Sequence, residues 1–285
     1  MRLNYFDRSL SGDFLALYCS RAISFVAIGF FGVFLPIFIY RISGENFSVV
    51  ILFYLLTSLF YALLLPAVMA VINRIGMKRS LIIGILFGAG YLGTLGLTDE
   101  RNWPWLLSAT AVGLIAFRLF YWIPFHTDFA VFTKKDTRGR EVSLLESTRR
   151  LFGIFTPIIA GAVIARFGFE VLFFLSVALY LLAVWPLSKI SRVNERYTWS
   201  YAQTWRELFS VRRRRDFYAF LASGAESGIG LVVWPIFLFL LLEGNYFEIG
   251  ALSTLIVAAT IALQLWAGKY VDSIDRAKLL RWGTH

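Results

Sequence analysis

Residues 48–79 read SVVILFYLLTSLFYALLLPAVMAVINRIGMKR. The first 25 of these residues carry no charge, and the last six include the three cations Arg74, Lys78 and Arg79. A run of about 20 apolar residues rising 1.5 Å per residue crosses the roughly 30 Å hydrocarbon core of a bilayer, where lipid offers the backbone no hydrogen-bond partner. This stretch therefore predicts a membrane-spanning helix that ends in a basic turn.

The same pattern recurs along the chain and predicts eight spans. They are Phe14 to Tyr40, Ser48 to Ile72, Leu81 to Leu97, Trp105 to Phe125, Leu151 to Ala165, Val171 to Leu187, Phe217 to Leu242 and Ile249 to Ala267. The fifth span is the shortest. We retain it because, without it, the Arg-rich gap after the sixth span would face the exterior instead of the cytoplasm. We expect an all-α, polytopic membrane helical bundle.

The cations indicate which side of the membrane each gap faces. Of the 28 Lys and Arg residues, 23 lie in the amino-terminal segment and in every second gap, whereas the other gaps hold only Arg41, Arg101 and Arg166. Because basic loops stay cytoplasmic, we expect a multi-pass protein of the cell membrane with its amino terminus in the cytoplasm.

Composition limits the alternatives. A hydrophobic share of 58% disfavours a soluble protein, and the net charge of +10 is accounted for by loops that face anionic lipid rather than nucleic acid. The single cysteine, Cys19, lies in the first span, so it suggests neither a disulfide nor a metal site. We expect no cofactor.

The largest break in apolar character lies between Ser191 and Arg215. It divides the chain into a six-helix half (1–190), a central cytoplasmic linker (191–215) and two helices of a second half with the loop that follows them (216–285). Within the linker Trp205, Leu208 and Phe209 recur at helical spacing, which favours a short amphipathic helix, with an irregular linker as the alternative.

Two turns of the chain are related at an offset of 199 residues. MAVINRIGMKR (Met69 to Arg79) follows the second span, and GKYVDSIDRAK (Gly268 to Lys278) follows the eighth. Both place a polar residue at a helix end and cations after it, which indicates an internal duplication with six helices per unit.

These residues resemble the major facilitator superfamily of secondary transporters, whose signature is G-x-x-x-[DN]-R-x-G-[RK]-[RK]. The first copy matches at Asn73, Arg74, Gly76 and Lys78, and the second keeps Gly268, Asp272 and Arg276. Arg138 to Arg140 resemble the R-G-R after the fourth helix. Thr156, Pro157 and Gly161 resemble G-P-x-x-G-G of the fifth helix, and the turn from Arg166 to Glu170 resembles the short loop that follows it.

The resemblance implies secondary active transport of a small solute by alternating access. The degenerate fifth-helix motif favours proton-coupled export, and we expect a monomer in the bilayer. Family members usually have twelve spans, so we interpret this chain as truncated after the eighth, the alternative being a natural eight-span form. A transporter-like scaffold or non-transporting fragment stays an alternative. A membrane-embedded enzyme is disfavoured, since no arrangement such as G-x-S-x-G or H-x-x-x-H is found.

Three charged residues lie well inside spans: Arg21, Arg118 and Glu226. Glu226 lies about 14 Å along its helix, where a charge costs on the order of 2.5 to 3.5 kcal/mol. The resemblance implies that helices one, four and seven line the cavity. We expect Glu226 to exchange a proton and Arg118 to bind an anionic group or pair with Glu226, the alternative being a structural ion pair. Arg21 is expected to snorkel to the interface.

The remaining candidates lie near the cavity or the cytoplasmic face. Trp122 and His126 continue the face of Arg118 at steps of four, and Trp234 and Gln264 are further candidate cavity contacts. We expect gate or loop ion pairs among the charged residues at this face, namely Asp128, Glu146, Arg149 and Arg150. The basic turns, Asn73 to Lys78 and Gly268 to Arg276, are expected to control conformation rather than bind substrate.

Overall fold

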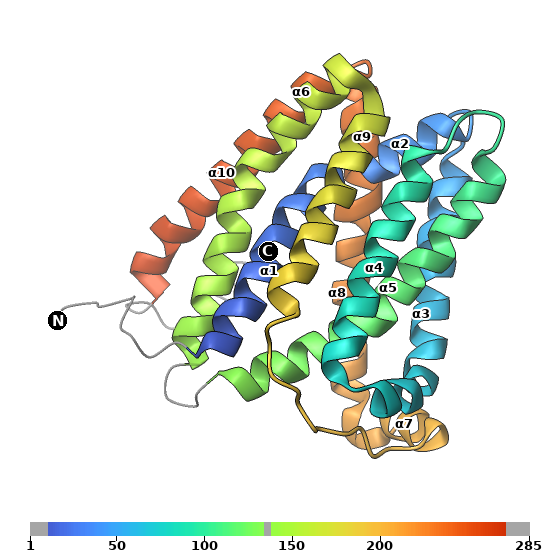
Figure 1. Cartoon of the computed structure of the whole chain (residues 1–285). Helices are drawn as coiled ribbons and strands as arrows, with labels where there is room; N and C mark the ends of the chain where they lie inside the picture. Colours follow the sequence, from blue (N-terminus) through green and yellow to red (C-terminus); the bar gives the residue numbers. More distant parts are fainter. Residues whose placement is uncertain (1–10, 134–137, 272–285) are drawn as a thin grey trace.

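The computed structural model describes residues 11–133 and 138–271, and these residues form a bundle of helices (Figure 1). Seven helical stretches are long and apolar enough to cross a membrane. The helices of the first half are α1 (Gly12–Phe31), α2 (Phe34–Ile42), α3 (Phe47–Ile75), α4 (Met77–Gly96), α5 (Trp103–Phe132) and α6 (Arg138–Leu187). After them come α7 (Tyr201–Leu208), η1 (Val211–Arg213), α8 (Arg214–Gly228), η2 (Ile229–Val233), α9 (Trp234–Leu241) and α10 (Tyr246–Val271). The predicted all-α membrane bundle is confirmed.

The first predicted span is divided between α1 and α2. The Ser11 hydroxyl caps α1 by accepting the Phe14 N–H at 3.1 Å. Pro36 in the first turn of α2 has no N–H to donate to the Gly32 carbonyl, which explains why the helix is interrupted there.

The fifth and sixth spans lie within α6, which is 50 residues long. The helix is interrupted at Gly168, whose φ of 84° and ψ of 174° lie outside the helical region. Glycine adopts a positive φ at no steric cost, so it permits the chain to turn between the two spans. The weak fifth span is therefore helical, and the expected turn from Arg166 to Glu170 is present.

The seventh span consists of α8, η2 and α9. The π-helical turn η2 lies directly before Trp234 and Pro235. Pro235 cannot donate to the Leu231 carbonyl, and such a gap in the ladder is a known cause of local widening. Glu226 lies one turn before this irregular segment.

The predicted amphipathic helix of the linker is present as α7. The Ser200 hydroxyl accepts the Gln203 N–H at 3.2 Å, and Trp205 stacks on Phe209 with ring centroids 5.9 Å apart. α7 lies at the end of the bundle, beside the end of α3 (Figure 1). We call this the linker end, and the opposite end, where α10 begins, the Tyr246 end.

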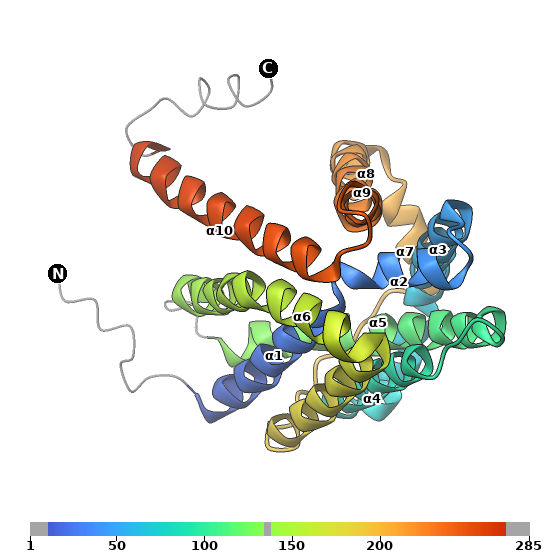
Figure 2. The ribbon, with the colours of Figure 1, turned by 90° about the horizontal axis from the view of Figure 1, so that it is seen from above.

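The helices of the first half pack closely, whereas α10 contacts the bundle along one side. α1 packs on α6, and α4 packs on α5 and α6. Glycines permit this approach: a Cβ atom at Gly88 would overlap the Tyr180 ring, and one at Gly84 would press on Tyr121. In Figure 2, α10 lies alongside α6 and extends away from α3, α4 and α5. Many apolar side chains of α3, among them Leu52 and Leu55, are exposed, as expected of a lipid-facing helix.

Candidate functional site

The two charged residues that were predicted to form the transport site lie on different helices and are not paired. Arg118 is half-buried on α5, where its charge acts on the tyrosines of α3 and α4, Tyr54, Tyr61 and Tyr91. Glu226 is exposed on α8. Within the described residues no ion pair joins them.

Arg21 does not snorkel, and that prediction is wrong. Its side chain is only 6% exposed and lies among four aromatic rings. The guanidinium carbon is 4.5 Å from the ring centroid of Phe25, 4.7 Å from Trp122, 5.2 Å from Phe125 and 5.5 Å from Tyr121. Packing of α1 against α5 places these rings around the cation, and a desolvated cation over aromatic faces gains about 2 kcal/mol or more per contact.

These four rings, which we call the Arg21 cage, leave part of the guanidinium without a polar partner. Arg21 Nη1 donates to the Tyr121 hydroxyl at 3.5 Å, while the buried Nε has no hydrogen-bond acceptor among the described residues. The sequence carries a signal for this site that was not among the predicted site features: an arginine in the first span and the aromatic run from Tyr121 to Phe125 in the fourth.

Trp122 and His126 share one face of α5, as predicted from their spacing. Their rings stack with centroids 5.7 Å apart and an interplanar angle of 18°. The Trp122 ring therefore contacts both the Arg21 guanidinium and the His126 imidazole. His126 is exposed and lines a cavity of about 590 Å³ between α5 and the linker, together with Met77 and Tyr197.

The other predicted cavity contacts lie apart from this cluster. Trp234 is 45% exposed at the start of α9, where it packs on Phe237. Gln264 on α10 accepts a hydrogen bond from Arg150 of α6. Both Gln264 and Arg150 line a cavity of about 730 Å³ between α6 and α10 at the linker end.

Of the ion pairs expected near the linker end, those of Glu146 with Arg149 and Arg150 are present. The prediction that Asp128 forms an ion pair is wrong. Glu146 pairs with Arg149 and, at 3.4 Å, with Arg150. Asp128 is instead fully buried, and neither of its carboxylate oxygens has a hydrogen-bond partner among the described residues. Asp13 at the start of α1 is near enough to repel it. The packing of α1 on α5 thus buries an aspartate that sequence position alone places at the surface.

The fifth-helix motif lies where α6 meets α1 and α10. A Cβ atom at Gly29 of α1 would overlap the Thr156 side chain. On the other side, a Cβ at Gly161 would overlap the Tyr246 carbonyl, and one at Gly250 of α10 would overlap the Pro157 carbonyl. The motif therefore brings the backbones of the two helices into direct contact toward the Tyr246 end.

Tyr246 contacts helices that precede the linker in the chain and helices that follow it. Its ring packs on Phe34 of α2, Phe169 of α6 and Phe239 of α9, with centroid distances between 5.2 and 6.5 Å. Its hydroxyl accepts a hydrogen bond from Arg41. This cluster joins α2, α6, α9 and α10 at the Tyr246 end, whereas a cavity lies between α6 and α10 at the linker end.

The first basic turn is fastened to the linker. Asn73 Nδ2 donates to the Tyr197 carbonyl at 2.8 Å, and Asn73 Oδ1 accepts the Tyr197 N–H at 3.0 Å. Lys78 donates to the carbonyls of Ser188 and Ile190, each at 2.7 Å. Arg74 is exposed, and Gly76, with φ 86°, separates α3 from α4.

The second basic turn lies largely outside the described residues. This applies to Asp272 and Arg276, whereas Gly268 lies in the last part of α10.

The sequence profile of the Major Facilitator Superfamily matches residues 17–284 of the chain. A comparison with curated proteins found no match. The chain belongs to the Major Facilitator Superfamily. Its members are membrane transporters of small solutes and not enzymes, and the apolar helices accord with a multi-pass membrane protein.

Proposed function

We propose that this protein moves a small solute across the cell membrane by alternating access, with its amino terminus in the cytoplasm. The observation that carries the proposal is the unequal contact between the halves. At the Tyr246 end, Gly161 and Gly250 bring two backbones together and Arg41 bonds to Tyr246. At the linker end, α6 and α10 line an open cavity of about 730 Å³. A molecule closed at one end and open at the other corresponds to one of the two states that alternating access requires.

Arg118, Trp122 and His126, which follow one another at steps of four on α5, are the proposed solute contacts, and Trp234 and Gln264, which lie apart from them, are proposed to contact the solute elsewhere on its path. Aromatic rings beside few polar groups suit an amphipathic solute, and a cation such as Arg118 suits an acidic group on it. The Arg21 guanidinium and the His126 ring both contact Trp122, which supports a fixed position for this ring.

We further propose that Glu226 carries the coupled proton and that transport runs in the direction of export. An unpaired carboxylate in mid-membrane costs on the order of 2.5 to 3.5 kcal/mol when charged, so a change in its surroundings between the two states changes its proton affinity. The irregular turn η2, which starts at Ile229, lies next to it, and such turns are frequent at functional sites. Export rests on the fifth-helix motif alone.

A substrate-independent experiment tests the proton role. Ser253 is buried on α10 one turn from Gly250, so in a Cys19→Ser background Ser253→Cys reports opening of the Tyr246 end. We expect its labelling rate by a membrane-impermeant maleimide, corrected for the reagent's own pH dependence, to vary with pH. Glu226→Gln should abolish this variation, because the amide cannot take up a proton.

The matched control is Glu243→Gln, which removes an equally exposed acid from the turn between α9 and α10. It should leave the pH dependence unchanged. An unaltered pH profile in Glu226→Gln would eliminate the proton role. Transport of amphipathic fluorescent solutes into proteoliposomes tests the broader proposal, since a scaffold without transport would accumulate none.

A further inference from the structure

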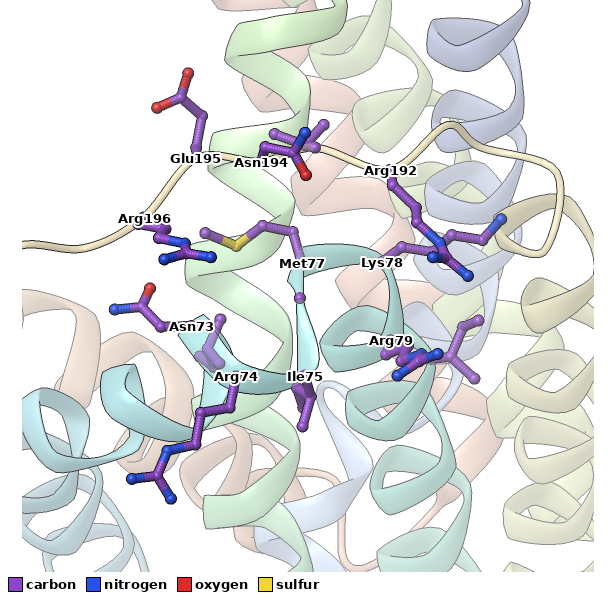
Figure 3. A pocket seen from close by; sticks show the side chains of 14 residues that line it. Asn73, Arg74, Ile75, Met77, Lys78, Arg79, Arg192, Asn194, Glu195 and Arg196 are labelled. Carbon is purple, nitrogen blue, oxygen red and sulfur yellow. The ribbon is translucent and has the colours of Figure 1, made fainter.

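A third cavity lies at the linker end, beside the cavity that His126 lines, with which it shares Met77, Glu195 and Arg196. Its volume is about 350 Å³, and it is enclosed by the turn between α3 and α4 on one side and by linker residues 192–196 on the other (Figure 3). The turn and the linker are held together by the paired hydrogen bonds of Asn73 and Tyr197. The cavity is thus bounded by segments that are more than 100 residues apart in the chain.

The lining of this cavity is strongly basic. It contains five cations and a single carboxylate, that of Glu195; the cations are Arg74, Lys78, Arg79, Arg192 and Arg196. None of the five forms an ion pair with another described residue. In Figure 3 the Arg192 side chain reaches from the linker toward Lys78 and Arg79, whereas the Glu195 carboxylate points away from them.

The first turn of α4 adds to the positive potential. Gly76 precedes it and offers no side chain to accept the free N–H groups that begin a helix. The turn carries no acidic residue and holds Lys78 and Arg79 instead, although helix dipoles favour anions at this end. Like charges so arranged repel one another, and a bound anion would relieve that repulsion.

We propose that this cavity binds a phosphate monoester, with the oxygens facing Arg79, Arg192 and the start of α4. Phosphate suits the site because guanidinium groups and free helix N–H groups are its usual donors in proteins. Two sources share this chemistry: a soluble phosphate-bearing compound and the headgroup of phosphatidic acid. Binding would fasten the linker to the α3–α4 turn. The inference does not depend on the proposed transport site, because none of its residues lines this cavity.

Calorimetric titration of the protein in lipid nanodiscs tests the proposal. In phosphatidylcholine nanodiscs at constant ionic strength, we expect inorganic phosphate to bind with a stoichiometry of one, while chloride gives no heat. In nanodiscs that contain phosphatidic acid, a lipid occupant would abolish the phosphate signal, and native mass spectrometry would detect one retained phosphatidic acid. The two arms therefore distinguish the sources.

Paired substitutions distinguish a specific phosphate-binding site from non-specific attraction of the anion to positive charge. Arg79→Gln with Arg192→Gln should weaken binding by roughly tenfold for each cation removed. Arg212→Gln with Arg214→Gln removes the same charge from exposed positions outside the cavity and should change affinity by less than about twofold. Arg79→Lys with Arg192→Lys should retain part of the binding, which shows that the fold is intact.

The proposal is overturned by either of two results. One is the absence of both phosphate binding and retained phosphatidic acid. The other is an equal loss in the cavity pair and in the control pair, since that would mean that net charge alone attracts the anion.

Discussion

The contact between α6 and α10 yields the sharpest test of the alternating-access proposal. A Cβ atom at Gly250 would lie 2.4 Å from the Pro157 carbonyl oxygen, about 1 Å inside ordinary van der Waals contact. The obstructing atom belongs to the backbone, so the helices themselves must separate. Overpacking of this kind costs about 1 to 3 kcal/mol. If the cost falls only on the state closed at the Tyr246 end, Gly250→Ala shifts the equilibrium toward the other state by roughly 5- to 150-fold.

The assay for this shift is the maleimide labelling of Ser253→Cys in sealed vesicles, from the side of the Tyr246 end. Labelling should accelerate in Gly250→Ala. The matched control is Gly153→Ala on α6, where an added Cβ would meet only Val257 Cγ1 at 3.9 Å and should leave the rate unchanged. Equal rates in Gly250→Ala and the parent protein would refute the view that this contact holds one end closed.

Two further predictions concern the Arg21 cage and the linker. Arg21→Lys should lower the melting temperature in detergent more than Arg21→Met does, because Met fills the buried cage without a charge that needs solvation; a tolerated lysine would instead indicate a hydrated side chain. Asn73→Ala should remove two hydrogen bonds, worth about 1 kcal/mol each, and so accelerate hydrogen exchange at the Tyr197 amide by at least about tenfold, with Asn194→Ala as the control. Unchanged protection at Tyr197 would mean that other contacts hold the linker in place.

The position of Asp128 illustrates why charged residues near helix ends are difficult to interpret. Their distance along the helix suggests a surface location, but α1 covers this part of α5, as the bond from the Ser11 hydroxyl to the Phe132 carbonyl indicates. Glu146, Arg149 and Arg150 were predicted correctly because residues three and four positions apart on one helix are neighbours whatever packs around them.

The sequence by itself determined where the chain forms helices, whereas the interruptions within the predicted spans Phe14 to Tyr40 and Phe217 to Leu242 were not predicted. Length and apolar character require a helix in lipid, while Pro36, Gly76, Gly168 and Pro235 interrupt or widen the backbone for local reasons of geometry. The repeated motifs were also sufficient to indicate the superfamily. These features depend on neighbouring residues in the chain, so they can be recognised without knowing the packing.

Only the tertiary structure decided which helix faces meet. A membrane helix is apolar on its lipid face and on its packed face alike, so its pattern does not reveal its partner. Packing of α1 on α5 encloses Arg21, and contact of α6 with α10 joins Gly161 to Tyr246 and Arg150 to Gln264. The basic cavity likewise arises because residues 74–79 and 192–196, separated by four spans, are brought together at one end of the bundle.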